Sequence, residues 1–174
     1  MGHFIIGTNT GLIYYDKANN KIDKPKAINQ ELATATYYSF VIKNQGMTNE
    51  FNVFNTNKGL VYINSSGVLD YYSELSKTFP NLDTISLHQN TGDALWVGSY
   101  KNGLFKLGTD GQINSHINQI NGHTGFSVYS MVTDDMGQLW LGTDIGLVIL
   151  NSGNNAVTLY KKDDGLQSDF FNLN

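Results

Sequence analysis

A motif that recurs four times along the 174-residue chain constrains its fold more than any other feature. Each copy has large apolar residues, then Thr or Ser, two or three variable residues, and a Gly-Leu pair. The pairs begin at Gly11, Gly59, Gly103 and Gly146, so successive copies are 48, 44 and 43 residues apart. Self-similarity at such a period indicates a chain of repeated supersecondary units, each about 43 to 48 residues long.

Short strands separated by turn residues fill each unit. In the fourth unit we expect strands at residues 127–133, 139–143, 147–150 and 156–160, and in the third at 83–89, 94–99, 104–107 and 112–117. A weak helical periodicity occurs near residues 30–37. Four meander strands in about 45 residues are typical of a β-propeller blade. The sequence therefore predicts an all-β fold, a partial propeller of about four blades, each a four-stranded antiparallel meander.

The repeated residues have structural explanations. Glycine before leucine suits a tight turn that needs a positive φ and has no room for a Cβ atom. We expect the leucine, and the large apolar residues Ile6, Phe54, Trp96 and Trp140, to lie between neighbouring sheets, where each buried side chain contributes roughly 1.5–3 kcal/mol. The residues assigned to the scaffold are Gly11, Gly59, Trp96, Gly98, Gly103, Trp140, Gly142 and Gly146.

The repeats predict one propeller domain over residues 1–174, with blades at about 1–36, 37–82, 83–126 and 127–169 and the start of another at 170–174. The chain enters at a second-strand sequence, residues 4–8, and ends as a first strand begins. The two ends could complete one blade in a small ring, or pair between two molecules, or belong to an open arc of a larger propeller. We favour an incomplete ring that associates with itself.

Composition argues against several classes of partner and site. All eleven basic residues are Lys and the net charge is −4, so the basic stripe and the Arg side chains typical of nucleic-acid binding are missing. No Cys is present, which excludes thiol nucleophiles and thiolate zinc sites. No apolar run reaches the roughly 20 residues that span a bilayer, and the first residues do not resemble a signal peptide.

The repeat resembles the two-component regulator propeller repeat. That pattern has an Asp-x-x-Gly turn, Leu-Trp, an aliphatic residue, Gly-Thr, two or three variable residues and Gly-Leu, and residues 135–147 match it throughout. The third unit matches with Ser99 for Thr and one inserted residue, whereas the first two lack Trp and the second has Asn55 in place of Gly. Residues 160–169 look like the link between blades of that family, with Gln167 and Asp169 in place of Pro and Asn.

This resemblance implies a function and a location. Repeats of that family build sensor domains, generally periplasmic, of membrane-bound histidine kinases and hybrid two-component systems in bacteria, which often sense glycan fragments. The resemblance thus implies a periplasmic sensory module of a membrane-anchored parent protein. We find no phosphoacceptor helix and no nucleotide lid in these residues, so kinase activity would belong to another part of the parent.

The residues give little support to catalysis. The histidines at 3, 88, 116 and 123 are scattered, without metal-ligand spacing. The pairs Asp134-Asp135 and Asp163-Asp164 are neighbours in the chain and point to opposite sides, so turn capping explains them better than acid/base work. Residues 133–140 also resemble the Asp-box turn of sialidases, which is structural. We expect no catalytic residue, no cofactor and no metal.

Propeller ligands bind where variable loops meet on one face around the channel. Aromatic, amide and carboxylate groups suit a sugar, and the candidate ligand-binding residues on these loops are Tyr100, Asn102, His123, Phe126 and Asp144. The predicted function is therefore non-catalytic sensing of a small ligand such as an oligosaccharide. Two alternatives stay open: a propeller glycosidase or lyase, and a protein-interaction scaffold.

Overall fold

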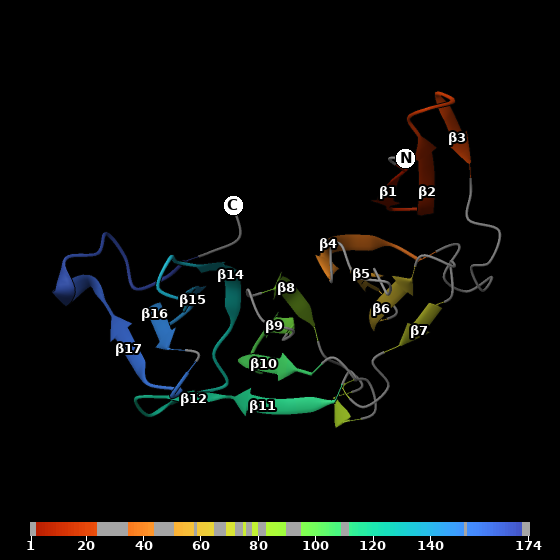
Figure 1. Ribbon diagram of the computed structural model, residues 1–174. Helices are drawn as coiled ribbons and strands as arrows, with labels where there is room; N and C mark the ends of the chain where they lie inside the picture. Colours follow the sequence, from red (N-terminus) through yellow and green to blue (C-terminus); the bar gives the residue numbers. More distant parts are fainter. Residues whose placement is uncertain are drawn as a thin grey trace. The chain divides into compact units, whose positions relative to one another are not determined.

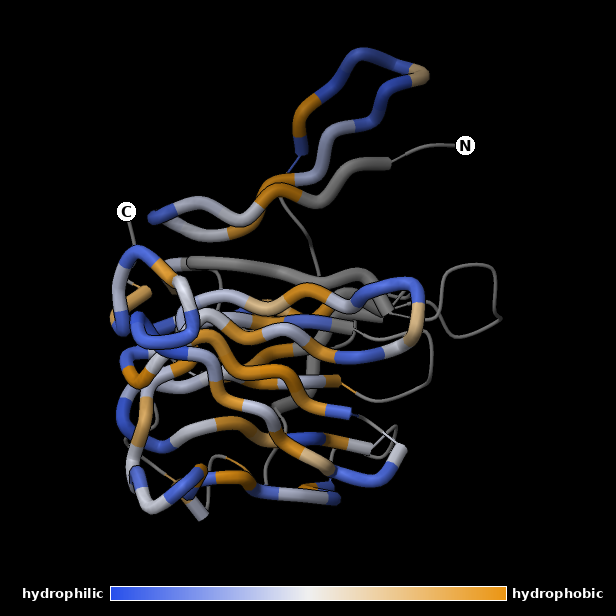
Figure 2. The backbone as a smooth tube through the Cα atoms, turned by 90° about the vertical axis from the view of Figure 1, so that its left-hand side faces the viewer, coloured by the Kyte–Doolittle hydropathy of each residue, from blue (hydrophilic) through white to orange (hydrophobic). Residues whose placement is uncertain are grey.

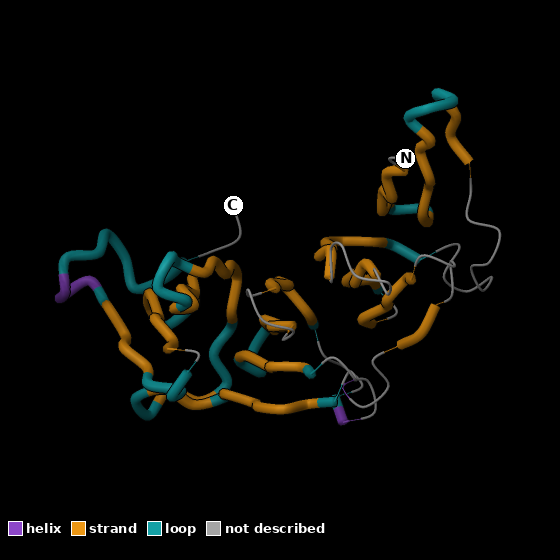
Figure 3. The backbone as a smooth tube through the Cα atoms, in the orientation of Figure 1, coloured by secondary structure: helices purple, strands orange, loops and turns teal. Residues whose placement is uncertain are grey.

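The structure is a computed structural model. It describes residues 3–23, 35–43, 51–57, 59–64, 69–71, 75, 78–79, 83–89, 95–108, 112–151 and 153–171. The chain forms two compact units, Met1–Ser76 and Lys77–Asn174, and each is described by itself. Strands make up most of the described residues of each unit (Figure 3). The described residues contain no helix that is long and apolar enough to cross a membrane.

The first unit contains two antiparallel sheets (Figure 1). Strands β1 (His3–Thr8), β2 (Gly11–Asp16) and β3 (Lys21–Asp23) form a three-stranded meander. Strands β4 (Tyr37–Lys43), β5 (Phe51–Thr56), β6 (Gly59–Asn64) and β7 (Leu69–Tyr71) form a four-stranded one. Each strand in these sheets pairs with its neighbours in the chain.

The second unit repeats the four-stranded meander twice. One sheet has β8 (Thr84–Gln89), β9 (Leu95–Ser99), β10 (Leu104–Leu107) and β11 (Ile113–Ile117). The other has β14 (Val128–Thr133), β15 (Gln138–Thr143), β16 (Gly146–Asn151) and β17 (Val157–Tyr160). A small hairpin of β12 (Gln119–Ile120) and β13 (His123–Thr124) links them, and a 3₁₀ turn, η1 (Lys162–Asp164), follows β17.

The predicted all-β class and its antiparallel meanders are confirmed. Every strand expected in the third and fourth units is present, with ends that agree within one residue. The weak helical periodicity was misleading where it can be checked, because residues 35–36 are irregular and Tyr37 begins β4; residues 30–34 lie outside the described part. The hairpin β12–β13 and the turn η1 were not predicted. The blade boundaries and self-association stay predictions.

The turn before each Gly-Leu pair has the same construction in the three-stranded sheet, where it joins β1 to β2, and in the three four-stranded sheets, where it joins the second strand to the third. Its glycine has a positive φ each time: 120° at Gly11, 105° at Gly59, 72° at Gly103 and 133° at Gly146. A Cβ atom on Gly146 would collide with the Tyr160 carbonyl oxygen at the end of the fourth strand. Glycine therefore permits both the backbone conformation and the close approach of that strand.

A side-chain hydrogen bond closes each of these turns and explains why the repeat has Thr or Ser. The hydroxyl donates to the glycine carbonyl oxygen at 2.7 Å for Thr8, 2.8 Å for Thr56, 2.8 Å for Ser99 and 2.6 Å for Thr143. Thr143 is fully buried, and its hydroxyl oxygen also accepts the Ile145 amide at 3.2 Å. A buried hydroxyl needs hydrogen-bond partners, and the turn provides them as a carbonyl acceptor and an amide donor.

The core of the second unit lies between its two four-stranded sheets. Ser86 Oγ donates to the Val128 carbonyl at 3.0 Å, and a Cβ atom on Gly98 would come within 2.9 Å of Val128 Cβ. The glycine thus lets the next sheet approach closely. The buried cluster contains Trp96, Leu104, Ile120, Phe126, Val128, Leu139, Leu141, Val148 and Leu150. Figure 2 shows that hydrophobic stretches follow the strands whereas the turns are mostly hydrophilic.

The expected packing of the four large apolar residues needs correction. Trp96 is buried and Trp140 is half-buried, but Ile6 is 43% exposed. Trp140 stands three residues before its turn hydroxyl, whereas Ile6 and Phe54 stand only two before theirs. Because side chains alternate along a strand, this offset places Ile6 and Phe54 on the opposite face from the tryptophans. Phe54 is nevertheless buried within its own unit.

The contact between the turn and the fourth strand can be tested at Gly146. We expect Gly146→Ala to lower the free energy of unfolding by about 3 kcal/mol or more, because the positive φ strains alanine and the Cβ meets the Tyr160 carbonyl. Gly122→Ala is the matched control: its φ is 83°, but among the described atoms nothing lies within 4 Å of the added Cβ. The control should lose about 1 kcal/mol in urea unfolding. Equal losses would contradict a role for the strand contact.

Candidate functional site

A pocket of about 520 Å³ lies in the second unit, where several connecting segments meet. The β9–β10 turn contributes Lys101, and the β15–β16 turn contributes Asp144 and Ile145. The segment from the β12–β13 hairpin into β14 and the segment after η1 complete it. Their lining residues are Gly122, His123, Thr124, Gly125, Phe126, Tyr129 and Phe170. The pocket is thus built by loops on a framework of two sheets.

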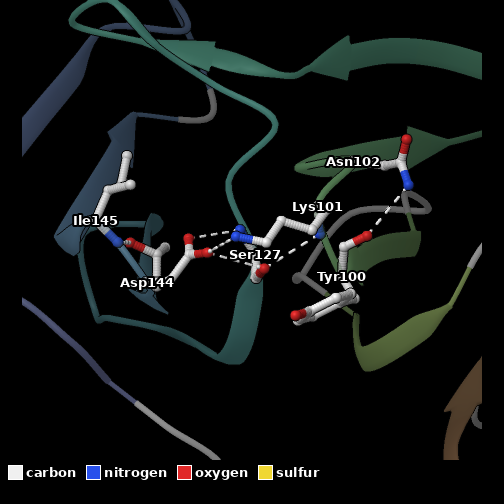
Figure 4. A network of polar contacts seen from close by, with 7 residues as sticks. Tyr100, Lys101, Asn102, Ser127, Asp144 and Ile145 are labelled. Atoms are coloured by element: carbon white, nitrogen blue, oxygen red, sulfur yellow. Dashed lines mark hydrogen bonds and ion pairs between the residues drawn. The ribbon is translucent and has the colours of Figure 1, made fainter.

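Asp144 is the centre of a polar network that joins the two turns (Figure 4). Its Oδ1 accepts the Ser127 amide at 2.7 Å, and its Oδ2 accepts the Ser127 hydroxyl at 3.0 Å and Lys101 Nζ at 3.2 Å. The Lys101 amide donates to Ser127 Oγ at 3.1 Å. The hydrogen bond that Lys101 donates to Asp144, reinforced by the charge of that carboxylate, raises the pKa of the Lys101 ammonium above its ordinary value. The network therefore holds a charged lysine at the pocket.

Lys101 has a strained backbone. Its φ is 61°, in the left-handed region that a lysine seldom adopts, and it lies in the longest of the four turns, the one with the inserted residue. A Cβ atom on Gly125 would come within 3.0 Å of the Lys101 carbonyl oxygen, so the neighbouring loop fits closely against it. Such strain persists only where the surroundings impose it, and it clusters at functional sites.

Three of the five sequence-predicted ligand residues, His123, Phe126 and Asp144, line the pocket. His123 is exposed, and its Nε2 lies 3.0 Å from Lys161 Nζ. An ammonium group can only donate, so the ring nitrogen is the acceptor in this contact. Phe126 is only 1% exposed and belongs to the core cluster, which corrects the expectation that its ring could stack on a sugar.

Tyr100 and Asn102 lie on the same turn as Lys101 but are not among the described residues that line the pocket. The Asn102 amide donates to the Tyr100 carbonyl at 3.1 Å and so turns away from Asp144 (Figure 4). Tyr100 is exposed, and Lys101 Nζ lies 5.6 Å from the centre of its ring. These two residues can contact only a ligand that extends beyond the pocket.

Sequence reasoning missed Lys101, Tyr129, Ile145 and Phe170. The inserted residue in the third turn was a usable signal for Lys101, since an extra residue at one turn of a repeat often serves function. Phe170 is 64% exposed, which is unusual for so large an apolar side chain. Nothing in the repeat pattern indicated that Phe170 and Tyr129 would line the same pocket, because they belong to different repeats of the sequence.

The carboxylates considered for acid/base chemistry serve turns. Asp134 accepts the amides of Met136 at 3.0 Å and Gln138 at 2.8 Å, and the Trp140 indole N–H at 2.8 Å. The indole hydrogen bond is the main cause that lowers the pKa of Asp134. Asp164 accepts the Lys161 amide at 2.8 Å and caps η1. Both aspartates therefore act as caps.

His88 and His116 make structural contacts. His88 and Thr133 share a hydrogen bond of 2.6 Å between the two sheets of the second unit. The His116 ring stacks on Phe105 at 4.0 Å, and its Nε2 donates to the Asn102 carbonyl at 2.8 Å. Across the described ranges, no three His, Asp or Glu side chains are grouped as a metal ion would need.

Comparison with known proteins establishes the fold. No family model matches the chain, and no curated protein matches it. Among solved structures, the extracellular domain of BT4673 from B. thetaiotaomicron, described as a hybrid two-component system, has a TM-score of 0.72 at 21% identity over 97% of this chain. The extracellular domain of BT3049 from the same organism, described likewise, has a TM-score of 0.66 at 21% identity over 90% of this chain.

The β-propeller domain of Cps50 (Swd1) from Myceliophteria thermophila also matches, with a TM-score of 0.55 at 12% identity, over 90% of this chain and 54% of its own. The chain has the fold of part of a β-propeller. It spans 22% of the BT4673 chain and 21% of the BT3049 chain, or about a fifth of each. The resemblance to sensor propellers that the repeat suggested is thus confirmed at the level of fold.

Stability below neutral pH should depend on His88. Burial lowers its pKa below the ordinary 6.5, so the unfolded chain takes up this proton at a higher pH than the folded chain does. The stability that neutral His88 contributes is therefore complete above the unfolded-state pKa of about 6.5 and is lost as the pH falls below it. We expect urea midpoints between about pH 7.5 and pH 5 to fall more for the wild type than for His88→Gln. Identical shifts would contradict this assignment.

Proposed function

We propose that the chain is a non-catalytic sensory module, part of a periplasmic propeller in a membrane-anchored bacterial two-component system, and that its pocket binds a glycan fragment. The observation that carries the proposal is the pocket itself. It combines an exposed aromatic ring, Phe170, with a hydrogen-bonding pair, Lys101 and Asp144, on a rigid framework. The fold of the extracellular domains of BT4673 and BT3049 supports a sensory role.

The chemistry of the pocket favours binding over hydrolysis. Asp144 is the one carboxylate among the described lining residues, and it is committed to Ser127 and Lys101. Glycosidases generally need two carboxylates that flank the scissile bond. His123 contacts Lys161 Nζ at 3.0 Å and has no described carboxylate beside it in the pocket lining. We therefore place the glycosidase or lyase alternative second.

A saccharide panel tests the proposal. We expect isothermal titration of the chain with neutral and acidic oligosaccharides to show saturable binding, and chromatography of the same mixtures to show no cleavage. Phe170→Ala should weaken binding by about tenfold, which corresponds to about 1.4 kcal/mol. Because the ring is exposed, we expect it to contribute more to the binding free energy than to the free energy of unfolding. The melting temperature of this variant should stay close to that of the wild type.

Met136→Ala is the matched control, since Met136 is also an exposed apolar residue but lies in the β14–β15 turn outside the pocket lining. It should bind like the wild type. Cleavage of any saccharide would establish the enzymatic alternative. Capture of a protein partner without saccharide binding would establish the interaction scaffold.

A further inference from the structure

We infer that the pocket recognises two neighbouring hydroxyl groups of an uncharged sugar, with Lys101 donating to one and Asp144 accepting from the other. The inference rests on the proposed function and specifies its ligand class. It concerns the ion pair of 3.2 Å between Lys101 Nζ and Asp144 Oδ2 that lies at the pocket.

The hydrogen bonds of the pair leave some donor and acceptor positions unused. A carboxylate offers about four lone-pair sites, and three at Asp144 are used by the Ser127 amide, the Ser127 hydroxyl and Lys101. One acceptor position on Oδ1 is left. Lys101 Nζ has three N–H donors and uses one on Asp144, so two are left. The lysine side chain is 59% exposed and that of Asp144 is 15% exposed, so the lysine is open to solvent and the carboxylate is partly so.

These unused positions, an acceptor on Asp144 and donors on Lys101, match a pair of adjacent hydroxyls. Each hydroxyl can both donate and accept, so one can donate to Asp144 while its neighbour accepts from Lys101. The oxygens of a vicinal diol are about one hydrogen-bond length apart. Lys101 Nζ lies 3.2 Å from Oδ2 of the same carboxylate whose Oδ1 has the free position, so donor and acceptor are close together. A sugar therefore meets the pair without breaking it.

The charge balance disfavours an acidic ligand. Asp144 compensates Lys101 at hydrogen-bond distance, so a ligand carboxylate beside Lys101 would face another carboxylate at close range. The nearby Lys161 ammonium is directed at His123 and is not among the described lining residues. The pair therefore presents a donor and an acceptor with no net charge.

The pair is also held in place before any ligand arrives. The left-handed backbone of Lys101 is fixed by the hydrogen bond from its backbone N–H to Ser127 Oγ, and Ser127 holds Asp144 with two further hydrogen bonds. Pre-organised groups lose little conformational entropy on binding. Phe170 offers an exposed face on the same pocket, suited to the C–H face of a pyranose ring.

Matched saccharides test the inference. Each pair has the same ring stereochemistry and linkage but differs in the group on carbon 5: glucose against glucuronate, galactose against galacturonate, and mannose against mannuronate oligomers. We expect the wild-type chain to bind the neutral member of at least one pair about tenfold or more tightly than its acidic partner in isothermal titration.

Two variants identify the groups. Lys101→Asn removes the ammonium with a residue that tolerates positive φ, and it should weaken neutral binding by about tenfold. Asp144→Asn can still accept from the Ser127 amide but leaves Lys101 without its counter-charge, so preference should move toward the acidic member. Lys17→Asn, at an exposed lysine in the first unit, is the control and should bind like the wild type.

The outcomes separate the two proposals. Tighter binding of an acidic member by the wild type, or unchanged neutral affinity in a folded Lys101→Asn variant, would overturn this inference and leave saccharide sensing intact. Binding of neither member of any pair would overturn the proposed function. Because the Lys101→Asn comparison stands alone, the inference can be refuted even if Asp144→Asn does not fold.

Discussion

The turn before each Gly-Leu pair is the constraint on which the rest of this structure depends. In each sheet a Thr or Ser hydroxyl bonds to the carbonyl of a glycine with positive φ. At Gly103 and Gly146 that glycine lies against the carbonyl oxygens of Ile117 and Tyr160, at the end of the fourth strand. The turn thus fixes the register of three strands at once, and a side chain on the glycine would push the fourth strand away.

The same turns supply the candidate site because they contain constant and variable positions side by side. The hydroxyl and the glycine are set by geometry, whereas the two or three residues between them can change without disturbing the sheet. Lys101 and Asp144 occupy such positions in adjacent turns and meet through Ser127. Residues that hold the turn and residues of the candidate site are therefore close neighbours along the chain.

Periodicity made the strands predictable, and its limits explain the errors. Alternating apolar residues and turn residues located the strands of the third and fourth units within one residue. A one-residue offset in the aligned repeats was enough to put Ile6 and Phe54 on the opposite face from the tryptophans, because strand side chains alternate. The small hairpin β12–β13 has two residues in each strand, too few to produce a period.

The candidate site was less predictable than the fold. Asp144, His123 and Phe126 were all chosen because their residue types suit a sugar, and all three line the pocket, but Phe126 is buried in the core. Exposure is decided by packing between sheets, which a local pattern does not encode. Phe170 and Tyr129 line the same pocket because the fold brings their segments together, which no local sequence pattern indicates.

The most direct measurement compares Thr143→Ser with Thr143→Val in urea unfolding. Serine keeps the hydroxyl that donates to the Gly146 carbonyl at 2.6 Å, whereas valine keeps the shape and removes the donor from a fully buried position. The account predicts that the valine variant loses about 1–3 kcal/mol more of the free energy of unfolding than the serine variant. A valine variant as stable as the serine variant would contradict the claim that this hydrogen bond holds the turn.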